Sequence, residues 1–419
     1  MDYTDVLVEL DRLHIVDTHE HLPTEEGIII RKPDFFDLLV PYVCDDLLCA
    51  GLELEKLKYM FDKKKDFEKR WKCLEPHLKN VQYTASFQAV RRVLNDIHGI
   101  SEVSLENALR VSDNLKNRVK QGYYEQTFKM MNIKRANIFL EDYRLMQGYD
   151  PHLFELVPTV SQFTPTSVKD INIIEEYTGV EVRNLYTLKE SIDSLFDIYR
   201  RYGIKAIKFG NSYQRRLDFI APDTFKSEAV LKRVLTGHIN LALNKKQLHQ
   251  SYSDYYKLLP LDDYITWCML GKCREMGIRA FFHTGIHAWN YNMVERCRAT
   301  YLNNAIKAFS DVEFELLHCG YPYFDDALLL AKYYPNVYLN MTWLHIIDRV
   351  KTEEIICRLL ETIPINKVSM FGGDYFFAEN VYGHLTIAKE NIAKVLYKKL
   401  IDKEMTETQI MHIARAWFE

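Results

Sequence analysis

Two histidines near the start of the chain, His19 and His21, have a spacing that can hold one metal ion. They lie in the segment HIVDTHEHL, at the end of a short apolar run typical of a β-strand. Side chains alternate along an extended chain, so residues i and i+2 point the same way. The alternative is that both are ordinary surface or loop histidines, so the pair needs support from the rest of the chain.

Three later segments place a histidine or an aspartate at the end of another apolar run. His283 occurs in FFHTG, His318 in LLHCG and Asp374 in FGGDY. Each lies next to or near glycine, which lets a backbone approach a ligand closely. Each could instead be a loop residue that satisfies its own hydrogen bonds. Taken together, imidazole nitrogens and a carboxylate are the donors that zinc, manganese, iron and related divalent ions accept.

The elements that would position these residues form an alternation of strands and helices. Eight short β-type runs recur with helical patterns between them, which predicts βα units and a parallel sheet. Eight such strands indicate an α/β fold, a closed (β/α)8 TIM barrel whose reactive groups gather at the carboxyl ends of the strands. The predicted strands cover residues 14–18, 136–140, 153–160, 203–209, 278–283, 312–318, 336–340 and 367–372.

Two intervals are too long for a single crossover helix. Residues from about 43 to 133 read as a helical insertion after the first strand. Residues 212–277 read as an extended insertion after the fourth strand. Both leave from carboxyl ends, so both are placed to cover the site. No repeat or linker divides the chain, and we expect one domain over residues 1–419 with these embellishments.

Composition limits the classes of partner. The formal net charge is −4, and 47% of the residues are apolar. A nearly neutral chain of this kind argues against nucleic acid or an anionic membrane as a partner. The eight cysteines include no Cys-x-x-Cys pair, and the start MDYTDVLVELDRLHI does not read as a targeting segment. We therefore expect a cytoplasmic protein with a small-molecule substrate, and homo-oligomerisation is left open.

The sequence resembles the amidohydrolase superfamily of metal-dependent TIM-barrel enzymes over nearly its whole length. The resemblance rests on HIVDTHEHL, KAIKFG, FFHTG, LLHCG and MFGGDY, in that order. The helical insertion and the tail AENVYGHLTIAKENIAKVLYKKL are similar to a subgroup near the uronate isomerases.

The resemblance implies a role for each motif. His19 and His21 would hold a divalent metal with Asp374, and His283 would be a further ligand or lie just beside it. His318 would lie near the substrate carbonyl. We expect zinc, as one ion rather than two. A metal held by neutral imidazoles generates hydroxide at neutral pH, and Asp374 can accept the proton as the water attacks.

Lys208 is the ambiguous residue of the segment GIKAIKFG. In some relatives a lysine of this strand is carbamylated and bridges two metals, and in others it remains an ammonium that holds an anionic group. We favour the ammonium, because Tyr213, Arg215 and Arg216 follow closely and suit a substrate carboxylate. The alternative is that these are surface charges. His287, His345, Trp289 and Trp343 are weaker candidates for lining the pocket.

These observations predict a metal-dependent hydrolase. Metal-bound hydroxide would attack the carbonyl carbon of an amide, lactone or ester in a small, anionic substrate, with Asp374 and His318 as the catalytic residues. The alternative on the same scaffold is a uronate-type isomerase or a decarboxylase. A metal-stabilised binding protein is a third reading, which retention of Asp374 with the ligand set disfavours.

Overall fold

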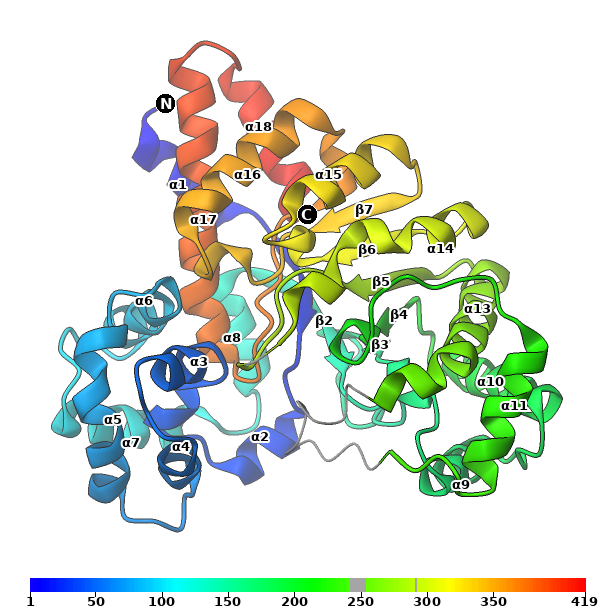
Figure 1. The fold of residues 1–419 in the computed structure, drawn as a ribbon. Helices are drawn as coiled ribbons and strands as arrows, with labels where there is room; N and C mark the ends of the chain where they lie inside the picture. Colours follow the sequence, from blue (N-terminus) through cyan, green and yellow to red (C-terminus); the bar gives the residue numbers. More distant parts are fainter. Residues whose placement is uncertain (242–253, 291) are drawn as a thin grey trace.

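The computed structural model describes residues 1–241, 254–290 and 292–419 of the chain. At its centre lie eight strands, and every ladder between neighbours is parallel (Figure 1). All eight predicted strands are present, with ends that move by a few residues. They are β1 (Ile15–Glu20), β2 (Ile133–Leu140), β3 (Phe154–Pro158), β4 (Ala206–Phe209), β5 (Arg279–His283), β6 (Phe314–Leu317), β7 (Val337–Asn340) and β8 (Val368–Ser369).

Backbone hydrogen bonds join two groups of strands into a ring. The ladders run β1-β2-β3 and β4-β5-β6-β7-β8. Between β3 and β4, the amide of Val160 donates to the carbonyl of Lys208 at 2.9 Å. Just beyond β8, the carbonyl of Phe371 accepts from the amide of Thr18 in β1 at 3.1 Å. The predicted barrel is therefore confirmed.

Helices cover the outside of the ring. Strands β4 and β6 are buried at every position, as expected of parallel strands with a packed barrel interior on one face and helices on the other. Residues 141–153, all described, join β2 to β3 without a helix. The helices that precede or follow the other strands are α8 (Tyr123–Met131), α9 (Val168–Thr178), α10 (Leu185–Arg201), α13 (Leu259–Met276), α14 (Asn303–Ala308), α15 (Phe324–Tyr333), α16 (Arg349–Thr362) and α17 (Ala378–Ile401).

The first insertion is helical, as predicted, but it begins earlier than residue 43. Its first helix starts at Glu25, because the Thr24 side chain accepts a hydrogen bond from the amide of Gly27 and caps the helix. Later helices are capped in the same way by Asp66, Thr84 and Ser104. The helices are α2 (Glu25–Arg31), α3 (Tyr42–Cys49), α4 (Leu54–Phe61), α5 (Phe67–Val81), α6 (Ala85–Arg92) and α7 (Leu105–Arg118).

The second predicted insertion is only partly an addition to the barrel. It contains α11 (Thr224–Leu235) and then α13, which packs against α10, α11 and β5. This makes α13 the outer helix that precedes β5. Residues 242–253 of this interval lie outside the described residues.

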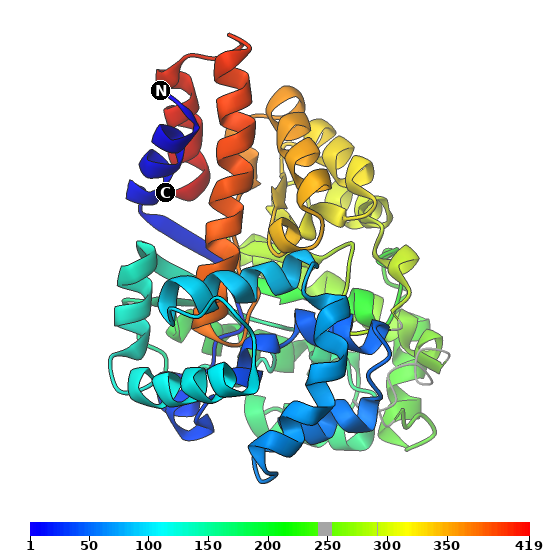
Figure 2. The ribbon, with the colours of Figure 1, turned by 90° about the vertical axis from the view of Figure 1, so that its left-hand side faces the viewer.

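A group of helices from both ends of the chain packs beside the barrel. Helix α17 is long, and α1 (Tyr3–Arg12) packs along it, while α18 (Glu407–Phe418) follows it (Figure 2). Among the described helices, none combines the length and apolar character needed to cross a membrane. That the whole chain is one domain stays a prediction.

Candidate metal centre

Three predicted ligands meet at the carboxyl end of the barrel. His19 Nε2 lies 3.3 Å from His21 Nε2. Each of these nitrogens also lies 3.3 Å from Asp374 Oδ1. Within the described part of the chain, this is the only set of three His, Cys, Asp or Glu side chains with ligand atoms within 4.8 Å of one another. Strands β1 and β8 therefore bring together donors from the two ends of the sequence.

The dimensions of this triangle suit a divalent ion. A point equidistant from three atoms at this spacing lies about 1.9 Å from each, slightly less than the Zn to N or O bond of about 2.0 to 2.2 Å. The three donor atoms are therefore spaced so that one divalent ion could contact all of them. The outer ring nitrogens, Nδ1 of His19 and Nδ1 of His21, are buried without a hydrogen-bond partner among the described residues. The donor set fits a metal, although the usual outer support for each imidazole is missing.

The backbone around Asp374 is shaped to place its carboxylate against β1. Asp374 has a positive φ of 62°, which is uncommon for a residue other than glycine. Its amide donates to the carbonyl of His19 at 2.8 Å, and its own carbonyl accepts from Tyr42 Oη at 2.6 Å. Glycine precedes it because a Cβ at Gly373 would overlap Glu20 Oε1. The FGGDY motif is thus a geometric requirement of the site.

Burial and charge set the protonation of the cluster. Burial lowers the pKa of His19 well below its usual value, which keeps the imidazole neutral. Burial alone would raise the pKa of Asp374, but His19 and His21 together hold it well below its usual range. The cluster thus offers the neutral imidazole of His19 and the carboxylate of Asp374, the forms in which these side chains bind metal.

Lys208 points to the same cluster from β4. Its Nζ lies 3.5 Å from His19 Nε2 and 5.1 Å from the centre of the Phe139 ring. The Phe139 ring also stacks on His19 at 3.7 Å. Burial lowers the pKa of Lys208, and the Asp374 carboxylate opposes that effect. The structure places this lysine where it can meet a group bound beside the ligands.

A pair of buried carboxyl groups, missed by our sequence analysis, lies behind the ligands. Asp17 Oδ1 accepts from the amides of His19 at 3.2 Å and Gly373 at 3.4 Å. Glu20 Oε2 accepts from the amide of Tyr375 at 2.8 Å. Burial raises the pKa of Asp17 to about 7 and also raises that of Glu20. Both residues belong to the motif HIVDTHEHL. The alternation of side chains along the strand does not indicate that their carboxyl groups bind backbone amides beyond β8.

His283 lies outside the group of three ligand atoms, among the described residues. Its Nε2 lies 2.8 Å from the carbonyl of Ile286, so this nitrogen carries the proton. Its Nδ1 lies 3.3 Å from His318 Nε2. The predicted alternative is a position just beside the metal ligands. Nε2 of His283 is bound to a backbone carbonyl, while its unprotonated Nδ1 faces His318 Nε2. Both roles stay predictions.

His318 has the tautomer of a proton acceptor. Its Nδ1 lies 3.0 Å from the carbonyl of Thr342 and therefore carries the proton, which leaves a lone pair on Nε2. Burial lowers its pKa to about 4. Its ring lies 6.1 Å from that of His19 and 5.6 Å from that of Trp343. His318 is thus a neutral base at the edge of the cluster.

The residues that follow β4 divide into two groups. The Tyr213 ring lies 4.7 Å from the His283 ring and 4.2 Å from the His287 ring, so Tyr213 and His287 line the site. Arg215 does not: its Nη1 is paired with Asp262 at 3.1 Å and Asp263 at 2.7 Å. These carboxylates take the forked contacts that we predicted for a substrate, so the substrate role of Arg215 stays a prediction without geometric support.

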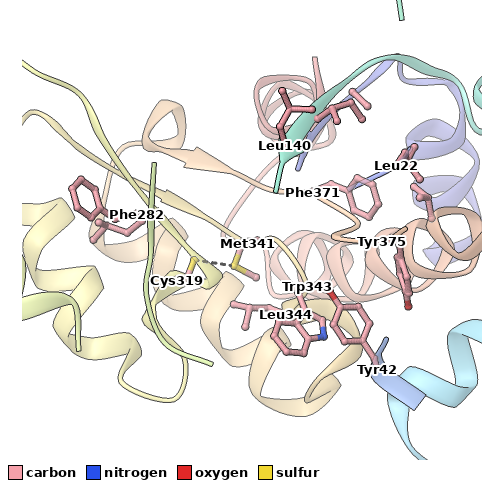
Figure 3. Packing of buried hydrophobic residues seen from close by; sticks show 14 of the residues in the cluster. Leu22, Tyr42, Leu140, Phe282, Cys319, Met341, Trp343, Leu344, Phe371 and Tyr375 are labelled. Atoms are coloured by element: carbon pink, nitrogen blue, oxygen red, sulfur yellow. Dashed lines mark hydrogen bonds between the residues drawn. The ribbon is translucent and has the colours of Figure 1, made fainter. Parts of the chain in front are cut away.

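His345 and Trp343, two of the weaker candidates for lining the pocket, have different surroundings. His345 is buried with Nε2 at 2.9 Å from the carbonyl of Met370, a structural contact. Trp343 stacks on Tyr42 from α3, with ring centres 4.3 Å apart (Figure 3). Sequence analysis missed Tyr42, because it comes from the insertion and nothing local indicates a contact with residue 374.

Comparisons with known proteins agree with this fold and with these motifs. Residues 245–405 match the sequence model of a family described as Amidohydrolase. Protein fluG from Emericella nidulans is 29% identical over 133 residues, which cover 32% of this chain and 15% of that protein.

Solved structures extend the likeness to the whole chain. A uronate isomerase from Thermotoga maritima has a TM-score of 0.78 and 12% identity, covering 100% of this chain and 96% of its own. A proposed metal-dependent hydrolase from Lactobacillus casei has a TM-score of 0.63 and 14% identity, covering 99% of this chain and 94% of its own. The matched segment and the shared fold confirm the resemblance of this chain to the amidohydrolase superfamily, with a fold like that of the uronate isomerases.

Proposed function

We propose that the protein is a metal-dependent hydrolase that cleaves an amide, lactone or ester bond of a small anionic substrate. The observation that carries this proposal is the triangle of His19, His21 and Asp374, whose three donor atoms lie 3.3 Å apart. The presence of a single such group among the described residues supports one divalent ion, and zinc is our first candidate. The matched family and the barrel fold support an enzyme that acts on a small molecule.

The chemistry requires both an electrophile and a base. A divalent ion held by the three ligands would polarise a carbonyl oxygen and lower the pKa of a bound water to about 7. Asp374 is a carboxylate at neutral pH and lies among the ligand atoms, so it can take the proton that the attacking water loses. His318 Nε2, which has a lone pair, is a second acceptor at the edge of the cluster.

Lys208 is the proposed contact for the anionic part of the substrate. It is the cation that lies nearest to the ligand atoms among the contacts described above, with its Nζ 3.5 Å from His19 Nε2. As an ammonium it would pair with a substrate carboxylate in a site where water is largely excluded. Its lowered pKa also leaves room for the carbamylated form, in which CO2 would be joined to Nζ and the carbamate oxygens would be anionic metal ligands.

The second candidate is an isomerase of the uronate type, or a decarboxylase, on the same scaffold. The observation that favours it is the fold, which covers 96% of a uronate isomerase chain. Such a reaction would also use Asp374 or His318 as a base, but on a carbon-bound or hydroxyl proton. Fold likeness cannot choose between the two, because chemistry is decided at the site.

Turnover by metal-reconstituted protein would test these proposals. We expect hydrolysis within a panel of lactones and N-acyl amino acids, and no change in a set of uronates. Conversion of uronates alone would favour the isomerase. Asp374→Asn protein at the same metal content is the matched control, and it should be nearly inactive in either case. A fully loaded protein that turns over nothing in a broad panel would contradict both. Native mass spectrometry would count metal ions and reveal a carbamate on Lys208.

A further inference from the structure

Helix α3 of the insertion reaches two separate parts of the barrel mouth. Tyr42, its first residue, donates from Oη to the carbonyl of Asp374, just after β8, at 2.6 Å. Asp45, one turn later, accepts at Oδ2 from the amide of Trp289, beyond β5, at 3.0 Å. Strands β5 and β8 are three positions apart in the ring. A helix anchored at both points therefore joins these two parts of the opening, and it lies beside the loops that leave the strands (Figure 1).

The contact between α3 and the loop after β5 consists of more than one hydrogen bond. Asn290 Nδ2 donates to the backbone carbonyl of Asp45 at 3.4 Å, so two successive residues bind the same turn of α3. Trp289 has a φ of 70°, a backbone conformation that residues other than glycine rarely adopt. Such a conformation persists where its surroundings hold it. At Trp289, the hydrogen bond from its amide to the Asp45 carboxylate provides this constraint.

The other oxygen of this carboxylate has no evident structural use. Asp45 Oδ1 is buried and lacks a hydrogen-bond partner among the described residues. A buried carboxylate with only part of its hydrogen-bonding capacity satisfied is costly for folding, which points to a role beyond stability. The role available to it here is to hold Trp289.

The loop held in this way leads directly to the candidate centre. The amide of Ala288, next to Trp289, donates to Tyr213 Oη at 3.3 Å. The Tyr213 ring in turn lies 4.7 Å from that of His283. The centre below is nearly covered: the His19 side chain has no exposed surface, and those of His21 and Asp374 are 12% and 13% exposed.

We propose that Asp45 is a positioning residue, which clasps residues 288–290 to α3 and makes α3 a strap across the mouth that limits access to His19, His21 and Asp374. The strap must loosen for a substrate to reach these side chains. The inference rests on the proposed metal function in one respect only, because the metal serves as a probe of access.

Extraction of Co²⁺ by dipicolinate would measure that access. In Co²⁺-loaded protein, the visible absorption of the ion reports its loss. Asp45→Ala should speed extraction about 10- to 100-fold, the effect of removing a hydrogen bond to a charged group, while the amount of bound Co²⁺ stays the same. Asp45→Asn keeps an oxygen for the Trp289 amide and should not speed extraction.

The matched control is the neighbouring carboxylate. Asp46 accepts from Thr84 Oγ1 at 2.7 Å and ties α3 to α6, not to the β5 loop. If Asp46→Ala speeds extraction as much as Asp45→Ala, the effect is a general loosening of the insertion, and the clasp is wrong. If Asp45→Ala does not fold, Tyr42→Phe releases the strap at its other end and should speed extraction; an unchanged rate would overturn the proposal.

Hydrogen exchange at the Trp289 amide tests the clasp without metal. Asp45→Ala should remove the protection of this amide, whereas Asp45→Asn and Asp46→Ala should retain it. Equal protection in all four proteins would overturn the proposal. A wild-type protein that binds no Co²⁺ would contradict the proposed function instead. The hydrogen-exchange measurement would still test whether Asp45 holds Trp289.

Discussion

At the residue scale, the ligand assignment depends on two imidazoles whose Nε2 atoms lie 3.3 Å apart. His21→Ala or His19→Ala should reduce bound metal from one ion per chain to nearly none, because two donor atoms bind a metal ion more weakly than three. The fold should remain, since both side chains lie at the rim and not in the packed layers of the barrel. Metal analysis with circular dichroism checks this. Full metal content in both variants would contradict the assignment.

Asp374 combines the roles of ligand and base, and these can be separated. Asp374→Asn keeps one oxygen for the metal but has no carboxylate to take a proton. We expect this variant to keep much of its metal. Its kcat should fall by a factor of about 10² to 10⁴, the usual contribution of a general base. Steady-state kinetics at matched metal content would measure the loss. A variant with wild-type kcat and full metal would show that Asp374 is neither base nor essential ligand.

At the element scale, the segment that follows β8 approaches the Glu20 side chain of β1 so closely that only glycine fits at position 373. A Cβ at Gly373 would overlap Glu20 Oε1. Gly373→Ala should therefore destabilise the protein by about 1 to 3 kcal/mol and weaken metal binding, because Glu20 or the segment that carries Asp374 must shift. Chemical denaturation and metal titration would measure both effects.

Gly271 supplies the control for this substitution. It lies in helix α13, and a Cβ there would meet nothing within 4 Å. Gly271→Ala should be neutral or stabilise by up to about 1 kcal/mol, since alanine is the better helix former. Similar losses in both variants would show that close approach at Gly373 is not the cause.

The clasp between α3 and the β5 loop should respond to pH. Burial raises the pKa of Asp45 from 3.8 to about 7, with Asp46 adding to the effect and the Trp289 amide opposing it. The closed form thus binds a proton more tightly than an open form with a solvated carboxyl group. Closure is favoured at low pH and weakens as pH rises from about 4 to about 7, by up to tenfold per unit, and levels off above that.

Co²⁺ extraction at several pH values would test this dependence. The wild-type rate, divided by that of Asp45→Asn at the same pH, should rise between pH 5.5 and about 7 and then stay constant. The Asn variant corrects for the pH dependence of the chelator, because it has no titrating group at this position. A ratio that does not change with pH would contradict the prediction.

Elements were easier to predict from the sequence than contacts between them. All eight strands could be located, because apolar runs beside glycine mark them locally. The last predicted strand, residues 367–372, is shorter in the structure, since the chain leaves the ladder at Ser369 to place Asp374. Tyr42 and Asp45 could not be identified, because their partners lie 332 and 244 residues away and no local pattern encodes such contacts.

At the scale of the whole molecule, a metal should act as a cross-link between the ends of the chain. His21 and Asp374 meet only in the folded barrel, so the unfolded chain should bind an ion poorly. At a free Zn²⁺ concentration 100 times Kd, binding should stabilise the fold by about 2.7 kcal/mol. Thermal unfolding with and without Zn²⁺ should show a higher Tm with metal, and no shift for His21→Ala. An equal shift in that variant would place the stabilising ion elsewhere.

The joining of β1 to β8 at this centre also has a consequence for biosynthesis. His19 and His21 leave the ribosome long before Asp374, which follows only when most of the barrel has been made. A growing polypeptide therefore carries two of its three donors throughout translation without a completed centre. Loading with metal must be a late event in maturation, and a truncated product that ends before residue 374 would be unable to compete for the cell's supply of the ion.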